Sequence, residues 1–202
     1  MDIALNPLSG SALADLGVLA VMAIVFAETG LLIGFFLPGD SLLVAAGIAA
    51  ADGKLSLPAL LIGVPIAAVV GAQVGYAIGR ATGPRLFTRP DSRFFRVEYV
   101  ERARHHLERF GAAKAIVLAR FIPIVRTMLN PVAGVLQVPT RTFALWNVLG
   151  GVVWSVGVTL AGYALGSKVK GIDKYLLPLI VVIVAISVIP IVLEVRRSSR
   201  SR

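Results

Sequence analysis

In FLPGDSLLVAAGIAAA, residues 36–51, a long apolar run breaks at Pro38 and Gly39 and then resumes, and this break is the main indication of the fold. The run before the break, from about residue 13 to 36, is long enough to cross a bilayer. The run after it, residues 42–51, is too short for a hydrocarbon core about 30 Å thick, since a helix rises about 1.5 Å per residue. A short apolar helix after a Pro-Gly break is typical of a re-entrant segment, and we predict one here.

A second broken segment, RFIPIVRTMLNPVAGVL, occupies residues 120–136. Its Phe-Ile-Pro at 121–123 matches the Phe-Leu-Pro at 36–38, and its Ala133-Gly134 pair matches Ala46-Gly47. Broken backbone at membrane depth is tolerated only where it is buried in protein or lines a water-filled cavity. Two such segments that enter from opposite faces predict an inverted repeat with a transporter site where they meet.

The rest of the chain predicts an all-α polytopic membrane protein with four spanning helices. Full spans are expected at about 13–36, 57–78, 143–165 and 176–193, and the polar stretch 80–114 contains a predicted amphipathic helix at 96–110 on the cytoplasmic surface. We interpret 1–202 as one integral membrane domain with a basic tail at 194–202. Glycines recur at 71, 75 and 79, which indicates either close helix packing or small filler residues. Three aromatic residues are candidate membrane-interface anchors: Trp146, Trp154 and Tyr163.

Composition supports a membrane location and excludes several classes of site. Of the 202 residues, 57% are hydrophobic, and the net charge of +9 comes from basic blocks that flank the apolar runs. The positive-inside rule accounts for these blocks better than nucleic-acid binding does, and it predicts that both termini lie on the cytoplasmic side of the membrane. The first apolar run is too long for a signal peptide, so we expect it to stay in the membrane. The absence of cysteine excludes disulfides and thiolate metal sites.

Four charged residues fall in apolar context: Glu28, Asp40, Arg120 and Arg126. Each would cost about 2.5–3.5 kcal/mol near the bilayer centre, so they are expected to pair, to contact water or to bind a ligand. The two carboxylates and the two guanidiniums can neutralise one another. Alternatively, the arginines bind an anionic head group such as phosphate while a carboxylate takes up a proton. Asp40 or Ser41 can also simply cap the short helix.

Other residues of the two broken segments are expected to support the site. Thr127 and Asn130 either donate hydrogen bonds to a ligand or satisfy carbonyls that the prolines leave free. The adjacent pair His105-His106 permits a metal or proton role, but solvated surface residues are the favoured interpretation. The remaining residues with a structural role are Pro38, Gly39, Pro123, Pro131 and Gly134.

From about residue 16 to 165 the chain resembles the DedA family of bacterial membrane proteins, which share a domain with eukaryotic lipid scramblases. The resemblance departs from the usual pattern at Ile124 and Val138. It implies transport driven by the proton motive force, with undecaprenyl phosphate, phosphatidylethanolamine or another solute as substrate. It also implies that Glu28 and Asp40 are the essential acidic pair and that Arg120 and Arg126 are the essential arginines. It rests on Glu28, 36–40, 111–112, 119–123, 125–127, 131–134, Phe143, Asn147, Gly150 and Trp154.

We therefore expect a flippase for a lipid phosphate, with undecaprenyl phosphate as the first candidate substrate and with protons and membrane lipids as its other partners. A phospholipid scramblase or phosphatidylethanolamine transporter is the first alternative. A membrane scaffold and an intramembrane lipid phosphatase are alternatives of other classes. We expect no enzyme activity, cofactor or metal, because no nucleophile with a base and no metal cluster falls among the membrane-embedded residues. The oligomeric state stays open.

Overall fold

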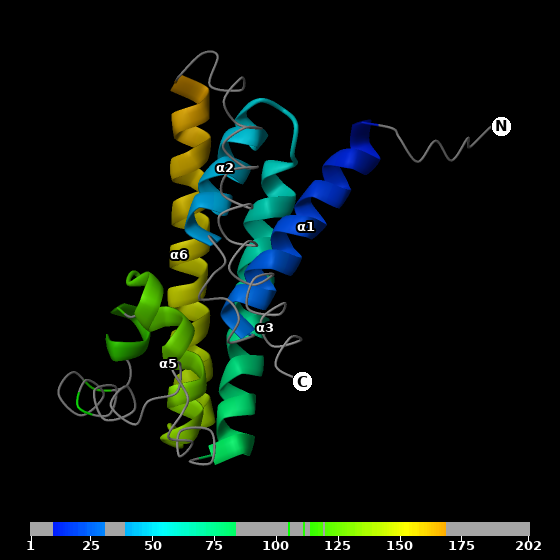
Figure 1. The fold of residues 1–202 in the computed structure, drawn as a ribbon. Helices are drawn as coiled ribbons and strands as arrows, with labels where there is room; N and C mark the ends of the chain where they lie inside the picture. The colour runs from blue at the N-terminus through cyan, green and yellow to red at the C-terminus, as the bar shows by residue number, and fades with distance from the viewer. Residues whose placement is uncertain are drawn as a thin grey trace, which may run out of the picture. The chain divides into compact units, whose positions relative to one another are not determined.

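The computed structural model describes residues 10–30, 39–83, 105, 111, 114–118 and 120–168 (Figure 1). These residues form the helices α1 (Gly10–Gly30), α2 (Gly39–Ala51), α3 (Leu57–Thr82), α5 (Pro123–Val135) and α6 (Thr140–Lys168). The all-α prediction is confirmed for this part of the chain. Several predictions lie outside the described residues: Pro38, the amphipathic helix at 96–110 apart from His105, the span at 176–193 and the tail at 194–202. The side chains of Pro123 and Thr127 lie outside them too.

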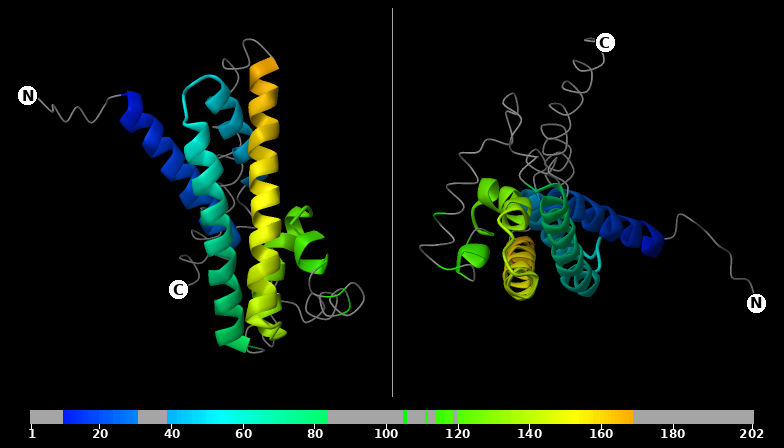
Figure 2. Two further views of the ribbon diagram at one scale, coloured as in Figure 1. Left: turned by 180° about the vertical axis from the view of Figure 1, so that it is seen from behind. Right: turned by 90° about the horizontal axis from the view of Figure 1, so that it is seen from below.

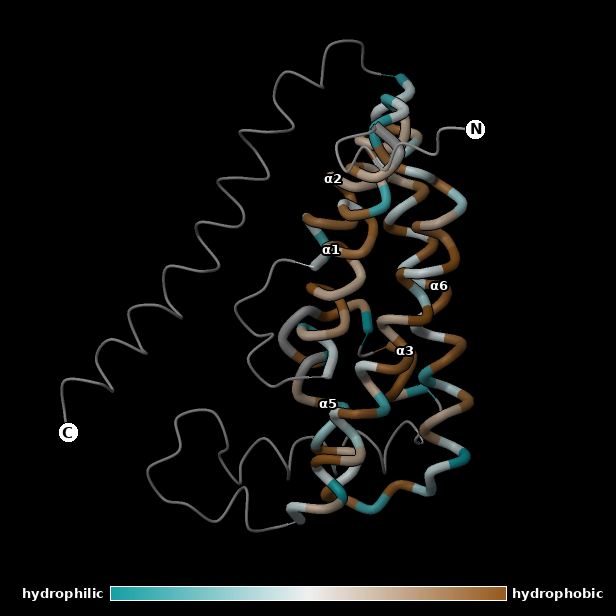
Figure 3. Tube along the Cα trace, turned by 90° about the vertical axis from the view of Figure 1, so that its right-hand side faces the viewer, coloured by the Kyte–Doolittle hydropathy of each residue, from teal (hydrophilic) through white to brown (hydrophobic). Residues whose placement is uncertain are grey.

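Three of the described helices are long and apolar enough to cross a membrane, namely α3, α6 and the Ala12–Gly30 part of α1. Their mean hydropathies are 2.0, 1.7 and 1.9 in the same order, and Figure 3 shows the apolar residues spread along them. Many of these apolar side chains are exposed, among them Leu16, Ile62 and Leu145. Because a soluble protein would not present such surfaces to water, this exposure fits helices that face lipid.

The other two helices, α2 and α5, have 13 residues each. At about 1.5 Å per residue each is about 20 Å long, which is shorter than the hydrocarbon core. The residue before α5, Ile122, is extended with φ −114° and ψ 107°, and Pro123 occupies the first turn. Proline favours this position because its fixed φ suits a helix and its missing N–H has no partner to lose there. Short helices therefore form where the two broken segments predict them.

By their internal contacts the described residues fall into two compact units. The first unit contains α1 up to Ile24, α2, α3 up to Val64 and α6 from Val156 onward. The second unit contains the end of α1 from Val25, α3 from Pro65, α5 and α6 up to Ser155.

In the first unit, α2 packs against α6 through glycine. A Cβ atom on Gly47 would overlap the backbone of α6 at Thr159 and Tyr163, and a Cβ atom on Gly162 would overlap the backbone of Val44. The two helices thus approach at the closest distance that backbones allow. Any side chain at either glycine would separate them.

In the second unit, α5 packs against α3 in the same way. A Cβ atom on Gly134 would overlap the backbone of α3 at Tyr76 and Arg80, and a Cβ atom on Gly79 would overlap the backbone of Pro131. The two contacts correspond residue for residue. The glycine of each short helix contacts the long helix at two residues, which lie three positions before and one position after the glycine of the long helix. The glycine of the long helix contacts the residue three positions before the glycine of the short helix.

The other glycines of the predicted motif receive the end of α1. A Cβ atom on Gly71 would overlap the Thr29 side chain and the Phe26 carbonyl, and one on Gly75 would lie 3.3 Å from the carbonyl oxygens of Thr29 and Gly30. Of the two interpretations of the 71–75–79 spacing, the structure therefore shows close packing. One glycine face of α3 seats α1 and α5 together.

A polar clamp joins α3 to the start of α6, which lie side by side in the second unit (Figure 2). The Tyr76 hydroxyl donates to the Val138 carbonyl at 2.6 Å and accepts from Arg80 Nη1 at 2.9 Å. Arg80 Nη1 also donates to Thr140 Oγ1 at 2.8 Å. The Tyr76 ring stacks on Phe143 with centroids 4.4 Å apart. This clamp fixes the register between the two helices that flank the candidate site.

Candidate functional site

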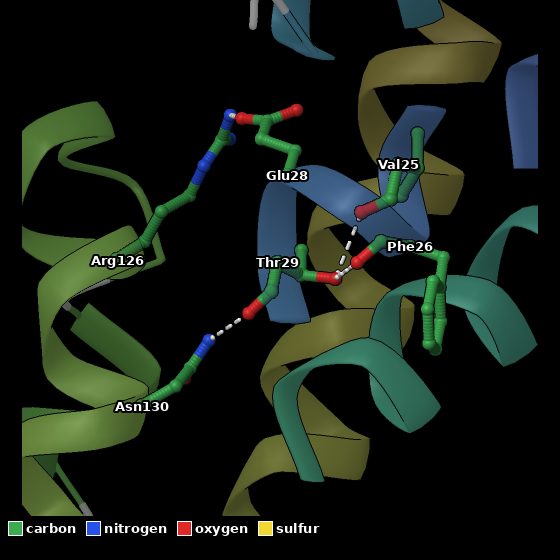
Figure 4. A network of polar contacts seen from close by, with 6 residues as sticks. All are labelled: Val25, Phe26, Glu28, Thr29, Arg126 and Asn130. Atoms are coloured by element: carbon green, nitrogen blue, oxygen red, sulfur yellow. Dashed lines mark hydrogen bonds and ion pairs between the residues drawn. The ribbon is translucent and has the colours of Figure 1, made fainter. Parts of the chain in front are cut away.

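The first feature of the site is an ion pair between α5 and α1. Arg126 Nη2 donates to Glu28 Oε1, and the two side chains are only 5% and 2% exposed (Figure 4). Arg126 lies in the first turn of α5, where the helix dipole is positive and a cation is disfavoured. Glu28 therefore compensates both the guanidinium and the helix end. The expectation that buried charges pair is confirmed for these two.

The second feature is an aromatic ring beneath the same arginine. The Cζ atom of Arg126 lies 4.4 Å from the ring centroid of Trp154 on α6. This is a cation–π contact, and it is strongest where water is excluded, as here. Trp154 is only 3% exposed, so the prediction that it anchors the protein at the membrane interface is wrong. Its ring lies inside the protein, against the guanidinium of Arg126.

Asn130, one turn after Arg126 on α5, has a structural role in this conformation. Its Nδ2 donates to the Thr29 carbonyl at 2.9 Å (Figure 4). Thr29 is the last residue but one of α1, so its carbonyl has no partner within the helix. The Thr29 hydroxyl in turn bonds the Val25 carbonyl at 2.8 Å. Of the two roles predicted for Asn130, the structure shows the one that satisfies a free carbonyl, but this carbonyl is free because α1 ends there and not because of a proline.

The third feature is a second buried arginine with a different partner. Arg120 is 4% exposed, and its Nη2 donates to Oδ1 of Asn147 on α6. Its side chain lies along α6 where Gly150 and Gly151 leave space, because ideal Cβ atoms there would approach Arg120 to 3.5 Å. Among the residues that the structure describes, Arg120 makes no ion pair. The interpretation that the two carboxylates and the two guanidiniums neutralise one another therefore does not hold for Arg120 within the described residues.

Positive charge consequently exceeds negative charge among the buried side chains that the structure describes in the second unit. Its buried described side chains include two guanidiniums, Arg120 and Arg126, and one carboxylate, Glu28. Arg126 is near enough to Arg120 for Coulomb repulsion between them. The N-terminus of α5 adds further positive potential, since no side chain caps it. A buried excess of this kind is a place where an anion would be stabilised.

The remaining predicted site residues are accounted for as follows. Asp40 lies in the first turn of α2, partly buried, where the positive end of the helix dipole stabilises a carboxylate. It belongs to the first unit, whereas Glu28 and both arginines belong to the second. Gly39, Pro131 and Gly134 are buried, and the two last-named lie in the α5–α3 contact. His105 is exposed, in keeping with a surface residue.

Two residues of α6 contact the arginines, and the sequence alone predicted this contact for neither of them. Asn147 received no role in the site, and Trp154 was predicted to be an interface anchor. Together with Gly150 and Gly151 they lie on α6 at spacings of three, four and seven residues, which places all of them on one helical face. That spacing, in a helix otherwise rich in exposed apolar residues, was the available signal. No cluster of three metal-binding side chains occurs within the part of the chain that the structure describes.

Comparison with known proteins identifies the family. Residues 37–164 match the VTT domain. The chain belongs to the DedA family of VTT-domain membrane proteins. The DedA-family relatives include Protein DedA of Escherichia coli, which is 42% identical over 180 residues, covering 88% of this chain and 81% of that protein. No solved structure matches the chain.

Two further DedA-family relatives support a membrane location. The uncharacterized membrane protein Rv0364 of Mycobacterium tuberculosis is 41% identical over 187 residues, which cover 90% of this chain and 80% of that protein. The inner membrane protein YqjA of Escherichia coli is 35% identical over 146 residues, or 72% of this chain and 66% of that protein. These names and the three apolar spans are consistent with a multi-pass inner membrane protein. Family membership is also consistent with a membrane transporter or flippase.

Proposed function

We propose that this DedA-family protein is a flippase that moves a lipid phosphate, undecaprenyl phosphate in the first instance, across the cytoplasmic membrane. The observation that carries the proposal is Arg120, a guanidinium that is 4% exposed and held by a neutral amide. A buried cation without a carboxylate partner is costly, and a ligand that brings negative charge removes that cost. Phosphate suits a guanidinium because its oxygens match the planar fork of N–H donors.

The long apolar surfaces of the helices explain how a small protein handles such a substrate. A lipid phosphate carries its charge in the head group alone, and its chain stays in the hydrocarbon. The protein then has to shield only the head group, for which the buried Arg120 and Arg126 offer two positive charges. Exposed apolar side chains on α1, α3 and α6 leave the lipid tail in contact with the bilayer.

Proton coupling is assigned in this proposal to the Glu28–Arg126 pair. While Glu28 is ionised, it neutralises Arg126. Protonation of Glu28 removes that charge and releases the guanidinium to the head group, so proton uptake and anion binding favour each other. Asp40, at the start of the other short helix, is proposed as a second proton acceptor.

The matched glycine contacts support the proposal of an inverted repeat. The pair α2 and α6 uses Gly47 and Gly162 as the pair α5 and α3 uses Gly134 and Gly79, with the same offsets to the contacted residues. Repeats of opposite orientation allow one fold to open alternately to each face. We accordingly propose that α2 and α5 are re-entrant, with a fourth span at 176–193 and both termini in the cytoplasm.

The test is a substrate panel in vesicles that contain the purified protein. A labelled polyprenyl phosphate, phosphatidylethanolamine and a soluble phosphate are followed across the bilayer separately, each with wild type and with Arg120→Gln. Arg120-dependent movement of polyprenyl phosphate alone supports the flippase. Movement of phosphatidylethanolamine and not of polyprenyl phosphate would replace it with the phospholipid transporter, and movement of nothing would favour a scaffold.

We also propose that the reaction is transport without chemistry. The same vesicles are assayed for inorganic phosphate released from the lipid phosphate in the absence of a gradient. No release above that of empty vesicles is expected. Release that Arg120→Gln abolishes would show an intramembrane phosphatase instead.

A further inference from the structure

We propose that Asn147 is a positioning residue whose neutral amide keeps the charge of Arg120 available to the anionic substrate. The inference rests on the proposed function and adds to it the residue that determines whether the site accepts an anion. Asn147 contacts both α3 and Arg120 and is fully buried, with 0% of its surface exposed. Its amide is the one side-chain partner that the described residues give this guanidinium.

The orientation of the Asn147 amide follows from its neighbours. On one side, Nδ2 donates to the Val69 carbonyl of α3 at 3.1 Å. A backbone carbonyl can only accept a hydrogen bond, so the NH₂ group has to face Val69. The Oδ1 atom is then left for Arg120, which can only donate. Both sides thus require the same orientation, and the amide links α3 to the arginine without adding charge.

Arg120 differs from Arg126 because its partner is a neutral side chain. Arg126 has a carboxylate partner in Glu28 and an aromatic partner in Trp154. Arg120 is equally buried, and its one side-chain partner among the described residues is the neutral amide of Asn147, which adds no negative charge beside the guanidinium. Arg126 is therefore suited to switching, whereas Arg120 is suited to standing attraction of an anion. An aspartate at 147 would remove this difference.

The steric surroundings fit the same role. Gly150 and Gly151 allow the Arg120 side chain to lie flat on α6, with Cγ and Cζ 3.5 Å from the positions that Cβ atoms would take. Asn147 holds the end of that side chain. One face of α6 thereby positions the guanidinium through both the glycine pair and the Asn147 amide. Rigid placement of a charged donor lowers the entropy cost when a ligand binds.

The experiment compares Asn147→Asp with Asn147→Ala in the purified full-length protein. Aspartate has nearly the same shape as asparagine, supplies a carboxylate to Arg120 and loses the bond to Val69. Alanine loses both hydrogen bonds and adds no charge. Thermal unfolding in a neutral detergent is recorded for wild type and both variants, alone and with increasing dodecyl phosphate, and with a dodecyl trimethylammonium salt as the control for detergent effects.

We expect dodecyl phosphate to stabilise wild type and the ammonium salt not to. Asn147→Ala should weaken apparent binding of dodecyl phosphate about 10-fold, because Arg120 loses its positioning bond. Asn147→Asp should weaken it about 100-fold or more, because the carboxylate neutralises Arg120 and repels the anion. Without any probe, Asn147→Asp should unfold at a higher temperature than Asn147→Ala, since it alone gives Arg120 a counter-charge.

The order of the variants in dodecyl phosphate binding and their order in unfolding temperature together distinguish this role from a purely structural one. A residue that only joined α3 to α6 would give variants whose binding falls in step with their stability. Equal binding of dodecyl phosphate by Asn147→Asp and wild type would overturn the inference and leave the proposed function standing. If wild type does not respond to dodecyl phosphate, the proposed function fails. The unfolding order without probe then decides the inference by itself, and a less stable Asn147→Asp would overturn it.

Discussion

Glu28 and Arg126 lie 98 residues apart in the sequence and form a buried ion pair between the end of α1 and the first turn of α5. The pair joins a spanning helix to a short helix that begins at a proline. A buried pair is costly to break, because one partner then remains as a buried charge without compensation. The same property makes the pair suitable as a switch, since a single proton on Glu28 removes the negative charge that neutralises Arg126.

The Glu28–Arg126 pair predicts non-additive stability with a separate loss of transport. Glu28→Gln and Arg126→Gln should each lower the free energy of unfolding by about 3–5 kcal/mol. The double variant should lose less than the sum of the two, because it buries no net charge. Unfolding in detergent measures the cycle. The structural alternative, in which the charges only neutralise each other, predicts that the double variant also recovers transport, and we expect that it does not.

Trp154 predicts a graded effect of ring chemistry on the site. Trp154→Phe keeps a smaller π face beneath Arg126, whereas Trp154→Leu keeps only bulk. Beyond the loss of volume, removal of the cation–π contact should cost about 1–2 kcal/mol because the site is dry. Substrate affinity and thermal stability should both fall in the order wild type, phenylalanine, leucine. Equal values for phenylalanine and leucine would show that the ring contributes volume alone. Trp146→Phe is the matched control, since Trp146 is only partly buried and packs beside the α3–α6 clamp.

The matched glycine contacts predict that one methyl group disables either short helix. Gly79→Ala and Gly162→Ala place a Cβ atom into the backbone of Pro131 and Val44 respectively, so α5 or α2 has to move. Overpacking usually costs about 1–3 kcal/mol. Each variant should lower the free energy of unfolding by more than this, because the contacted atoms belong to the backbone. Unfolding temperature and transport rate measure the effect.

Gly157→Ala is the internal control for these substitutions. Gly157 lies on α6 and is exposed, and a Cβ atom there would meet nothing within 4 Å. Alanine is favoured over glycine in a helix interior by about 1 kcal/mol, so this variant should be neutral or more stable. A loss equal to that of Gly162→Ala would show that α6 tolerates no change at glycine for reasons other than the contact with α2.

Gln137 predicts a stabilising substitution at the turn between α5 and α6. Its φ of +53° is left-handed, a conformation that favours glycine. The backbone N–H of Val138 bonds the Ala133 carbonyl at 3.0 Å, and that of Gln137 bonds the Gly134 carbonyl at 3.0 Å, which together form a Schellman motif. Gln137→Gly should raise the free energy of unfolding by up to about 1 kcal/mol. Gln137→Ala keeps the strain, so an equal gain from alanine would refute this cause.

Much of the fold was predictable from where the apolar runs stop. Residues 57–78 and 143–165 were predicted as spans, and α3 and α6 extend them by only a few residues. The two short helices were predicted from Pro38-Gly39 and Pro123, because a proline ends one helix and favours the start of the next. Glu28, Arg120 and Arg126 were identified by the cost of burying charge, which needs no knowledge of neighbours.

What the sequence left undetermined were the partners of those charges. Trp154 has the residue type and position of an interface anchor, and only the approach of α5 to α6 places its ring under Arg126. From the sequence alone, Asn147 could equally face lipid or form a hydrogen bond between helices. The positions of Arg120 and Val69 on either side of it decide between the two. Such contacts depend on how helices cross, and local periodicity does not determine that.

The proposed function is tested most sharply by gradient-dependent flipping of a labelled polyprenyl phosphate by Arg120→Gln, Glu28→Gln and wild type in vesicles. Variants are first shown to be folded by their cooperative unfolding in detergent. We predict that a proton gradient accelerates movement by wild type, that Arg120→Gln moves no lipid with or without the gradient, and that Glu28→Gln loses the response to the gradient. Wild-type rates from folded Arg120→Gln would contradict the claim that this buried guanidinium binds the head group.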